Sequence, residues 1–249
     1  MANRVAVIHC NPKSVWQSQR SGYFMEGFKN AGIECRITNS KAREDGLPVL
    51  LGTTFWRGIE RDGGEFLLID RCSFGETTQY VSLVWNGHGR RGDHHLPDHT
   101  TADRWEAMGE TLKPWKQRGS RFIVCGQTET YSPHYLTPED WYKSVRWATD
   151  FRPHPATMGI NTHGPANDRM DNFDGAVAVT LNSSIGVKCV IEGIPTITMD
   201  EGSMAWDVTG HSKDDIQMPA REEWAHRLAY TQWSDDEIRE GRLWSRLWY

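Results

Sequence analysis

The chain has 249 residues, of which 38% are hydrophobic, and its formal net charge is −5 at pH 7. This length suits one large domain or two small ones, and the acidic balance excludes a global attraction to nucleic acid or to an anionic membrane. No stretch approaches the roughly 20 consecutive apolar residues of a membrane helix, and the N-terminus lacks a signal-peptide pattern.

The first part of the chain alternates apolar runs with polar or amphipathic segments. Arg4–His9 is a short apolar run typical of a buried strand. Gly22–Ala31 follows a polar loop and has helical spacing, and Glu34–Thr38 is a second strand, which predicts a β–α–β opening of a parallel sheet. The G-x-G-x-x-G fingerprint is missing, so no tightly bound dinucleotide is expected. Further strands are predicted at Val49–Thr53, Phe66–Asp70 and Gln79–Val84.

A glycine- and histidine-rich loop, Trp85–His95, has the most unusual local composition in the chain. As a metal site, this part of the chain would offer His88, Asp93, His94, His95 and His99. Adjacent histidines in such a loop have no recognised ligand spacing, so no metal is expected. As a nucleic-acid contact it would offer Arg90 and Arg91 to phosphates. The plain alternative is a long solvated loop.

The five cysteines are scattered along the chain and form no C-x-x-C pair. This pattern indicates neither a zinc knuckle nor a disulfide framework. A protein with such cysteines fits best in a reducing cytoplasm.

In the middle of the chain, Thr101–Gly119 is amphipathic, and its apolar stripe predicts a contribution to the core. That stripe consists of Trp105, Met108, Leu112 and Trp115. Arg121–Gly126 then restarts the strand pattern and places Gln127 at the C-terminal mouth of a strand, where ligands bind in open α/β sheets. Pro138–Thr149 is a predicted helix that starts at a proline.

The stretch from Phe151 to Asp200 carries the main candidate site. Two apolar strands, Ala176–Leu181 and Pro195–Met199, flank a short helix over Ser183–Gly193. The helix would begin at Asn182-Ser183-Ser184, and the free N–H groups at its positive end favour an anion such as phosphate. The plain alternative is that these residues only cap the helix. The upstream Arg152-Pro-His154-Pro motif, which adds a cation and a histidine after another short strand, favours a phosphate or nucleotide site.

The chain ends in two predicted helices. Pro219–Tyr230 is the first, and Asp235–Trp248 is the second. A capping box of Ser234 and Glu237 marks the start of the second helix.

The segments RPHP and VTLNSSIGVKCVIEGIPTI resemble the C-terminal half of GT-B glycosyltransferases. The likeness is greatest to capsule-polysaccharide, sialic-acid and Kdo transferases, which have an HP motif and a later SS motif before a G-x-P turn. The resemblance implies an α/β, compact GT-B-like fold with two Rossmann-like halves facing across a cleft. Residues 1–120 would form the acceptor side and 121–215 the nucleotide-sugar side, with helices of 216–249 packing back across the cleft.

The resemblance also implies which residues bind the donor. His154, Ser183 and Ser184 would hold the phosphates of the nucleotide-sugar. Lys188 stands where many members have a ribose-binding glutamate, and Glu192, one turn later, is the candidate substitute. The full set of expected donor-binding residues is Gln127, Arg152, His154, Asn182, Ser183, Ser184, Gly186 and Glu192.

The chemistry expected from these residues is an inverting, metal-independent sugar transfer with no cofactor besides the nucleotide-sugar co-substrate. No D-x-D motif lies at a suitable strand end, so preorganised donors would stabilise the leaving phosphate. Asp70 is the first candidate for the general base, followed by Asp93 and His94. The loop that begins at Trp85-Asn86-Gly87 resembles the acceptor loop of these transferases, and its expected acceptor-binding residues are His88, Arg90 and Arg91.

The acceptor remains open between DNA and a glycan. The chain is short for a two-domain GT-B enzyme and resembles compact phage-encoded ones, which implies a hydroxymethylpyrimidine of phage DNA as one acceptor, in the host cytoplasm. The alternative acceptor is a capsule-type glycan. Two other classes stay open: a metal-dependent hydrolase built on the histidine-rich loop, and a non-catalytic module that binds nucleotide-sugar or DNA.

Overall fold

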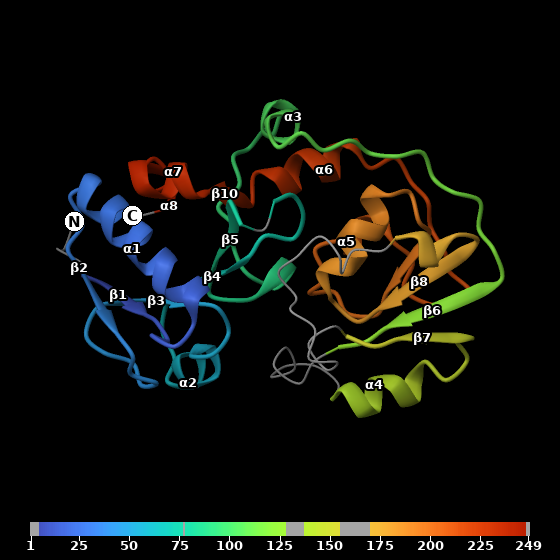
Figure 1. Ribbon diagram of the computed structural model, residues 1–249, viewed down its shortest axis with the longest axis horizontal. Helices are drawn as coiled ribbons and strands as arrows, with labels where there is room; N and C mark the ends of the chain where they lie inside the picture. Colours follow the sequence, from blue (N-terminus) through green and yellow to red (C-terminus); the bar gives the residue numbers. More distant parts are fainter. Residues whose placement is uncertain (1–4, 77, 128–136, 155–169, 248–249) are drawn as a thin grey trace. The chain divides into compact units, whose positions relative to one another are not determined.

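The computed structural model describes residues 5–76, 78–127, 137–154 and 170–247 (Figure 1). The chain forms two compact units, and each contains a β-sheet with helices packed on it. The expectation of an α/β fold with two Rossmann-like halves is therefore confirmed. The first unit comprises Met1–Cys72, Glu76–His99 and Tyr230–Tyr249, and the second comprises Ser73–Gly75 and Thr100–Ala229.

The sheet of the first unit has six strands in the order β10-β5-β4-β3-β1-β2. The strands β1, β2, β3 and β4 run parallel, whereas β5 is antiparallel to β4, and β10 is antiparallel to β5. The predicted strands of the first part of the chain are all present, with ends shifted by one or two residues. Their bounds are β1 Ala6–His9, β2 Cys35–Thr38, β3 Leu47–Leu51, β4 Leu67–Arg71 and β5 Tyr80–Trp85. The sixth strand, β10 Gln232–Ser234, was not predicted.

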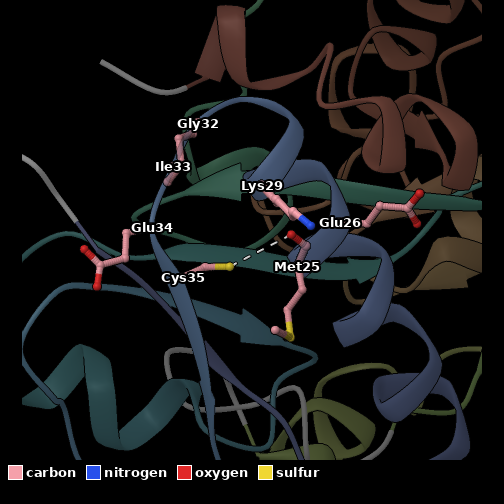
Figure 2. A pocket seen from close by; sticks show the side chains of 7 residues that line it. All are labelled: Met25, Glu26, Lys29, Gly32, Ile33, Glu34 and Cys35. Carbon is pink, nitrogen blue, oxygen red and sulfur yellow. Dashed lines mark hydrogen bonds between the residues drawn. The ribbon is translucent and has the colours of Figure 1, made fainter.

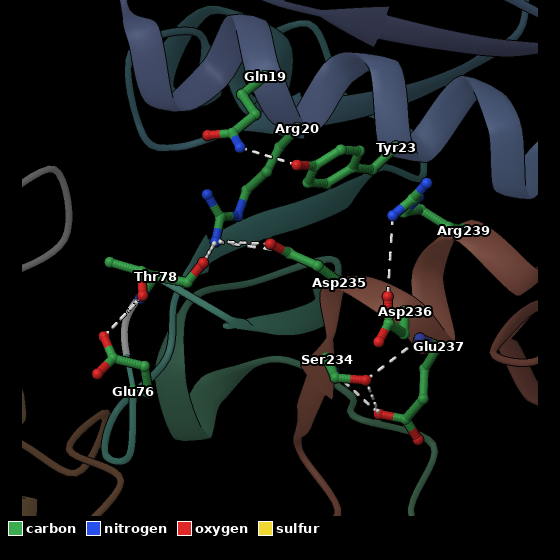
Figure 3. Close-up of polar contacts among 10 residues, drawn as sticks. All are labelled: Gln19, Arg20, Tyr23, Glu76, Thr78, Ser234, Asp235, Asp236, Glu237 and Arg239. Atoms are coloured by element: carbon green, nitrogen blue, oxygen red, sulfur yellow. Dashed lines mark hydrogen bonds and ion pairs between the residues drawn. The ribbon is translucent and has the colours of Figure 1, made fainter.

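Helix α1, Val15–Asn30, begins seven residues before the predicted start at Gly22. Ser14 caps it by accepting a hydrogen bond from Gln17 N–H. The expected polar loop over 10–21 is therefore wrong in its second half, because the buried face of this first turn and a half carries polar side chains instead of apolar ones. Arg20 is only 2% exposed, and its guanidinium donates to Thr78 O at 3.1 Å and to Asp235 Oδ2 at 3.4 Å (Figure 3).

The C-terminal segment belongs to the first unit and forms two helices, α7 Asp235–Glu240 and α8 Trp244–Leu247. The predicted capping box is confirmed, since Ser234 and Glu237 exchange both hydrogen bonds (Figure 3). The single predicted helix is wrong, because Gly241 ends α7 in the left-handed conformation at φ 78°. The expected boundary at residue 215 shifts to Tyr230, since β10 pairs with β5.

The hydrophobic core of the first unit is divided between the two faces of its sheet. On one face, α1, α7 and α8 cover a cluster in which Phe28 stacks on Trp244 with ring centroids 4.1 Å apart. On the other face, α2, Trp56–Arg61, covers Leu50, Leu68 and Val84.

The sheet of the second unit has four parallel strands in the order β7-β6-β8-β9. Helix α4 covers one face of this sheet through Trp141, and helix α5 covers the other face through Cys189 (Figure 1). The predicted strand–helix–strand unit over Ala176–Met199 is confirmed as β8, α5 and β9. The bounds are β6 Arg121–Cys125, α4 Pro138–Ser144, β7 Asp150–Arg152, β8 Ala176–Thr180, α5 Ser184–Ile191 and β9 Thr196–Thr198.

The segment 100–120 belongs to this second unit, not to the N-terminal half in which it was expected. Only α3, Asp103–Ala107, is helical, and the chain then runs on without regular structure through Pro114 to Gly119. The prediction that its apolar stripe contributes to the core is nevertheless confirmed. All four side chains pack in or against one cluster with α5 and with α6, Glu222–Ala229: Trp105, Met108, Leu112 and Trp115.

Three short 3-10 helices complete the described elements: η1 Gly89–Arg91, η5 Asp171–Phe173 and η6 Trp206–Val208. Among the helices of the described residues, none is both long enough and apolar enough to cross a membrane.

Candidate functional site

The ends of three neighbouring strands meet at the carboxyl edge of the second-unit sheet. The chain leaves β6 at Gly126, β7 at Pro153 and β8 at Leu181, and parallel strands bring such ends to one edge. Gly126 N–H donates to Arg152 O at 2.7 Å. A Cβ on Gly126 would lie 2.5 Å from His154 N, so the absence of a side chain lets the β7 end pass close to β6.

Two amide side chains bridge the ends of β6 and β8. Gln127 Nε2 donates to Asn182 Oδ1 at 3.1 Å. The main chain of Gln127 is fixed by Tyr142, whose hydroxyl accepts from Gln127 N at 2.9 Å and lies 3.2 Å from Gln127 O. Gln127 is only 5% exposed. Its Oε1 and the Nδ2 of Asn182 are buried, and neither has a hydrogen-bond partner among the residues that the structure describes.

The N-terminus of helix α5 follows this amide pair directly. Ser183 is the N-cap, and its hydroxyl accepts from Ile185 N at 3.4 Å, so the capping function expected from the plain alternative is confirmed. Ser184 is exposed in the first turn. A Cβ on Gly186 would lie 3.0 Å from Thr180 Cγ2, and the glycine thereby lets α5 approach β8 closely. The positive end of the α5 dipole is thus held at the strand edge.

Arg152 and His154 supply the basic side chains of this edge. Arg152 pairs in register with Cys125, and its guanidinium lies 5.6 Å from the centre of the Phe173 ring, on the sheet face covered by α5. Burial, and then the positive charge of Arg152, lower the pKa of His154 below its usual value. The imidazole is therefore neutral at neutral pH in the free protein. Burial raises the pKa of Cys125 to about 12, which leaves its thiol unreactive.

Glu192 lies at the other end of α5, where it is the C-cap residue and pairs with Lys113 Nζ at 2.6 Å. Eight residues of helix separate it from the strand edge by about 12 Å. The other seven expected donor-binding residues lie at the strand edge. Glu192 alone lies away from them, and it is therefore not part of the candidate site.

In the first unit, the structure pairs Asp70 at the end of β4 with His88. His88 Nε2 lies 3.3 Å from Asp70 Oδ2, and its ring stacks on Trp56 with centroids 5.2 Å apart. Burial acts to raise the pKa of Asp70, but the hydrogen bond and charge of His88 and the N–H of Arg71 outweigh it and lower that pKa. Asp70 is therefore an ionised carboxylate held against an imidazole, an arrangement that can accept a proton.

The other loop residues have different surroundings. His94 is 9% exposed, and its ring nitrogens lie 2.7 Å from Leu83 O and 3.1 Å from Gly89 O, so the imidazole ties the loop to the sheet. The Asp93 side chain is 65% exposed and accepts from His95 N–H at 2.7 Å. Arg90 and Arg91 are exposed on η1. Of the three base candidates, only Asp70 has a side chain that is both half-buried, at 21% exposed, and paired with a histidine.

The described residues contain no group of three or more His, Cys, Asp or Glu side chains able to hold a metal ion. A surface hollow of about 670 Å³ lies between α1 and the start of β2 (Figure 2). It is lined by none of the predicted site residues. Its thiol, Cys35, has a pKa raised by burial and by Glu34, so it is not an activated nucleophile.

Sequence reasoning missed two residues that contact these sites and one further buried histidine. Trp56 and Tyr142 lie on helices whose spacing indicates only core packing, and no sequence signal distinguishes their contacts with His88 and Gln127. His9 did carry a signal, because it is a polar residue that ends an apolar strand. It is fully buried, and its Nδ1 lies 3.0 Å from Ser40 O.

The comparisons with known proteins add a structural likeness. No protein-family model and no curated protein sequence matches the chain. Among solved structures, the chain is similar to KpsC, a beta Kdo 2,7 transferase of Thermosulfurimonas dismutans, with a TM-score of 0.48 and 14% sequence identity. The match covers 96% of this chain and 98% of that chain.

Proposed function

We propose that this protein is a glycosyltransferase that moves a sugar from a nucleotide-sugar donor to an acceptor hydroxyl. The observation that carries the proposal is the strand edge of the second unit. There His154, the Gln127–Asn182 pair and the N-terminus of α5 follow three neighbouring strands. The resemblance of the RPHP and NSS motifs to GT-B transferases points to the same residues.

The leaving nucleotide carries negative charge on its phosphate oxygens, and this edge supplies positive charge and hydrogen-bond donors to it. Arg152 provides a full charge, the α5 N-terminus provides oriented N–H groups, and His154 donates a hydrogen bond or becomes protonated as phosphate binds. These groups are part of the folded protein before the donor arrives, so little reorganisation is needed when the bond to the phosphate breaks.

For the acceptor, Asp70 is the proposed general base. As the acceptor oxygen forms its bond to the anomeric carbon and the phosphate leaves from the opposite side, the hydroxyl proton passes to the Asp70 carboxylate. His88 fixes the orientation of that carboxylate through the 3.3 Å contact. The transfer inverts the configuration of the sugar and needs no step through a metal ion. Asp93 is the second candidate, with His94 third because of its two carbonyl contacts.

The donor assignment is tested by a thermal-shift screen against UDP-, GDP-, CMP- and dTDP-sugars, because a ligand that binds only the folded state raises Tm. A His154→Ala variant and a Ser183→Ala/Ser184→Ala variant should lose most of the shift. Glu192→Gln, at the far end of the same helix, is the matched control and should keep it. A full shift in the first two variants would refute the site. Since Ser183 caps α5, unliganded Tm must be compared first.

The acceptor is tested separately, with hydroxymethylpyrimidine DNA and an oligosaccharide offered to the same protein. Exposed Arg90 and Arg91 favour a DNA acceptor. With DNA as the acceptor, the affinity for DNA and hence the rate of transfer should fall steeply as the salt concentration rises, because each neutralised phosphate releases counterions. An Arg90→Ala/Arg91→Ala variant should flatten that slope and keep donor binding. Turnover on the oligosaccharide alone, with no salt dependence, would reject the DNA acceptor and leave glycosyl transfer standing.

Two further measurements separate the competing classes of protein. Elemental analysis giving about one metal per chain, removed by a chelator together with activity, would favour a metal-dependent hydrolase. Slow hydrolysis of a bound nucleotide-sugar without acceptor would instead support a transferase over a non-catalytic binding module. A donor that binds but is neither hydrolysed nor transferred would identify the module.

A further inference from the structure

The amide pair at the strand edge has one unfilled hydrogen-bonding group on each side chain. Gln127 and Asn182 share a single hydrogen bond of 3.1 Å, while Gln127 Oε1 and Asn182 Nδ2 are buried with no partner among the described residues. Burying such groups without a partner costs free energy, so their placement requires an explanation. Their neighbours are the N-cap Ser183 and the fixed main chain of Gln127, both parts of the proposed donor site.

The unfilled groups do not depend on which amide atom is assigned as oxygen. If both amides are turned by 180°, Gln127 Oε1 accepts from Asn182 Nδ2, and the unfilled groups become Gln127 Nε2 and Asn182 Oδ1. In either orientation the pair presents one carbonyl oxygen and one N–H donor. The ligand that completes the pair must therefore both donate and accept.

A hydroxyl group meets this requirement, and a phosphate group does not. A sugar hydroxyl donates its proton to the amide oxygen and accepts from the amide N–H. A phosphate oxygen can only accept, so it would face the amide carbonyl as a second acceptor. Arg152, His154 and the backbone N–H groups of the α5 N-terminus already provide groups that suit phosphate. We propose that Gln127 and Asn182 bind a sugar hydroxyl of the donor, while these other groups bind its phosphates.

This inference rests on the proposed function, since it assigns a part of the same donor. The hydroxyl can belong to the transferred sugar or be the 2′-hydroxyl of the ribose, and three probes separate these sources: UDP-glucose, UDP and 2′-deoxy-UDP, or the same trio built on the nucleotide that gives the thermal shift. An effect on the nucleotide-sugar alone identifies the transferred sugar. An equal effect on the nucleotide-sugar and the ribonucleotide, with the deoxynucleotide spared, identifies the ribose 2′-hydroxyl.

Two substitutions at one position make the test specific. Gln127→Met removes the carbonyl oxygen and the NH2 group of Gln127 and keeps a side chain of nearly the same length. It should lower the affinity for the hydroxyl-bearing probe about tenfold. Gln127→Glu keeps an acceptor for the hydroxyl, and its second oxygen can accept from Asn182 Nδ2 if that amide turns by 180°, so it should lose less. If a phosphate occupied the position, the order would reverse, because the Glu carboxylate repels phosphate while Met is neutral. Isothermal titration calorimetry measures each affinity.

Three results would overturn the inference. The first is a Gln127→Met variant with wild-type affinity for all three probes and only a lower unliganded Tm, which would show an internal structural pair. The second is a loss on the deoxynucleotide as large as on the others. The third is a wild-type protein that binds no nucleotide of the panel, in which case the proposed function fails as well. If Gln127→Met does not fold, Asn182→Leu takes its place. As a second variant of the same kind, Asn182→Leu removes the other amide without adding charge, and it should show the same selectivity among the probes.

Discussion

Donor binding should tighten as the pH falls, and His154 should be the cause. Burial and the charge of Arg152 keep the pKa of His154 below its usual value in the free protein. A bound diphosphate brings negative charge that favours the imidazolium and raises that pKa. Between the free and bound pKa values, binding takes up a proton, so affinity rises as pH decreases through this window. Above both values the imidazole is neutral in both states, and affinity no longer changes with pH.

The size of the effect follows from the contact that His154 would make. A charge-assisted hydrogen bond is worth about 1.5–3 kcal/mol, and partial exposure of the imidazole places this one at the lower end. We therefore expect His154→Gln to weaken donor binding by roughly 10- to 30-fold at about pH 6. At about pH 8 only the neutral hydrogen bond is lost, so the difference between the two proteins should shrink to a few-fold.

The assay is calorimetric titration of a nucleotide diphosphate sugar in two buffers of different ionisation enthalpy, which counts the protons taken up. Such a donor is a diphosphate diester with no phosphate ionisation near neutral pH, so the count reports on the protein. The wild type should take up a fraction of one proton, and His154→Gln none. His88→Gln in the first unit is the control and should behave as the wild type. Proton uptake that persists in His154→Gln would refute the assignment.

Further predictions concern the base, the strand edge and the core. Asp70→Asn should lower turnover by about 10²–10⁴ and leave donor affinity unchanged, whereas Asp93→Asn should be nearly silent; the opposite ranking would move the base to Asp93. Gly126→Ala should weaken donor binding, because the new Cβ would lie 2.5 Å from a main-chain nitrogen, while Gly22→Ala, with nothing within 4 Å, should bind normally and unfold at higher denaturant. Burial lowers the pKa of His9 below 6.5, so the unfolded chain binds the proton first and stability is lost as pH falls below that value. His9→Asn should reduce this loss between about pH 7.5 and 5.5 in urea unfolding, and equal losses would count against it.

Much of the fold could be predicted because its parallel strands are buried. Strands such as β3 and β8 are covered on both faces, so they are continuous apolar runs that sequence alone identifies. The start of α1 could not be predicted in this way. Its first turns bury Gln17 and Arg20, and the reason is the contact of Arg20 with Thr78 and Asp235, which are far away in the chain.

The same distinction applies to the candidate site. The rule that ligands bind at the carboxyl ends of parallel strands predicted Gln127, and the start of a short helix after a strand predicted Asn182 and Ser183. It could not show that the first two form a pair, because they are separated by 55 residues, nor that Asp70 meets His88. Those contacts depend on strand order and on the path of a loop, which local patterns do not encode.

The two units differ in the electrostatic task for which their strand ends are suited. Glycosyl transfer removes a proton from one oxygen and leaves negative charge on another. In the first unit, Asp70 is kept ionised against His88, although burial opposes this, and a carboxylate in that state can receive the proton. In the second unit, the charge of Arg152, a neutral His154 and the α5 N-terminus can receive the negative charge. If His154 were already protonated in the free protein, its imidazole would bind phosphate with no uptake of a proton. A neutral His154 takes up a proton when the negatively charged phosphates bind, so proton uptake measures this proposal directly.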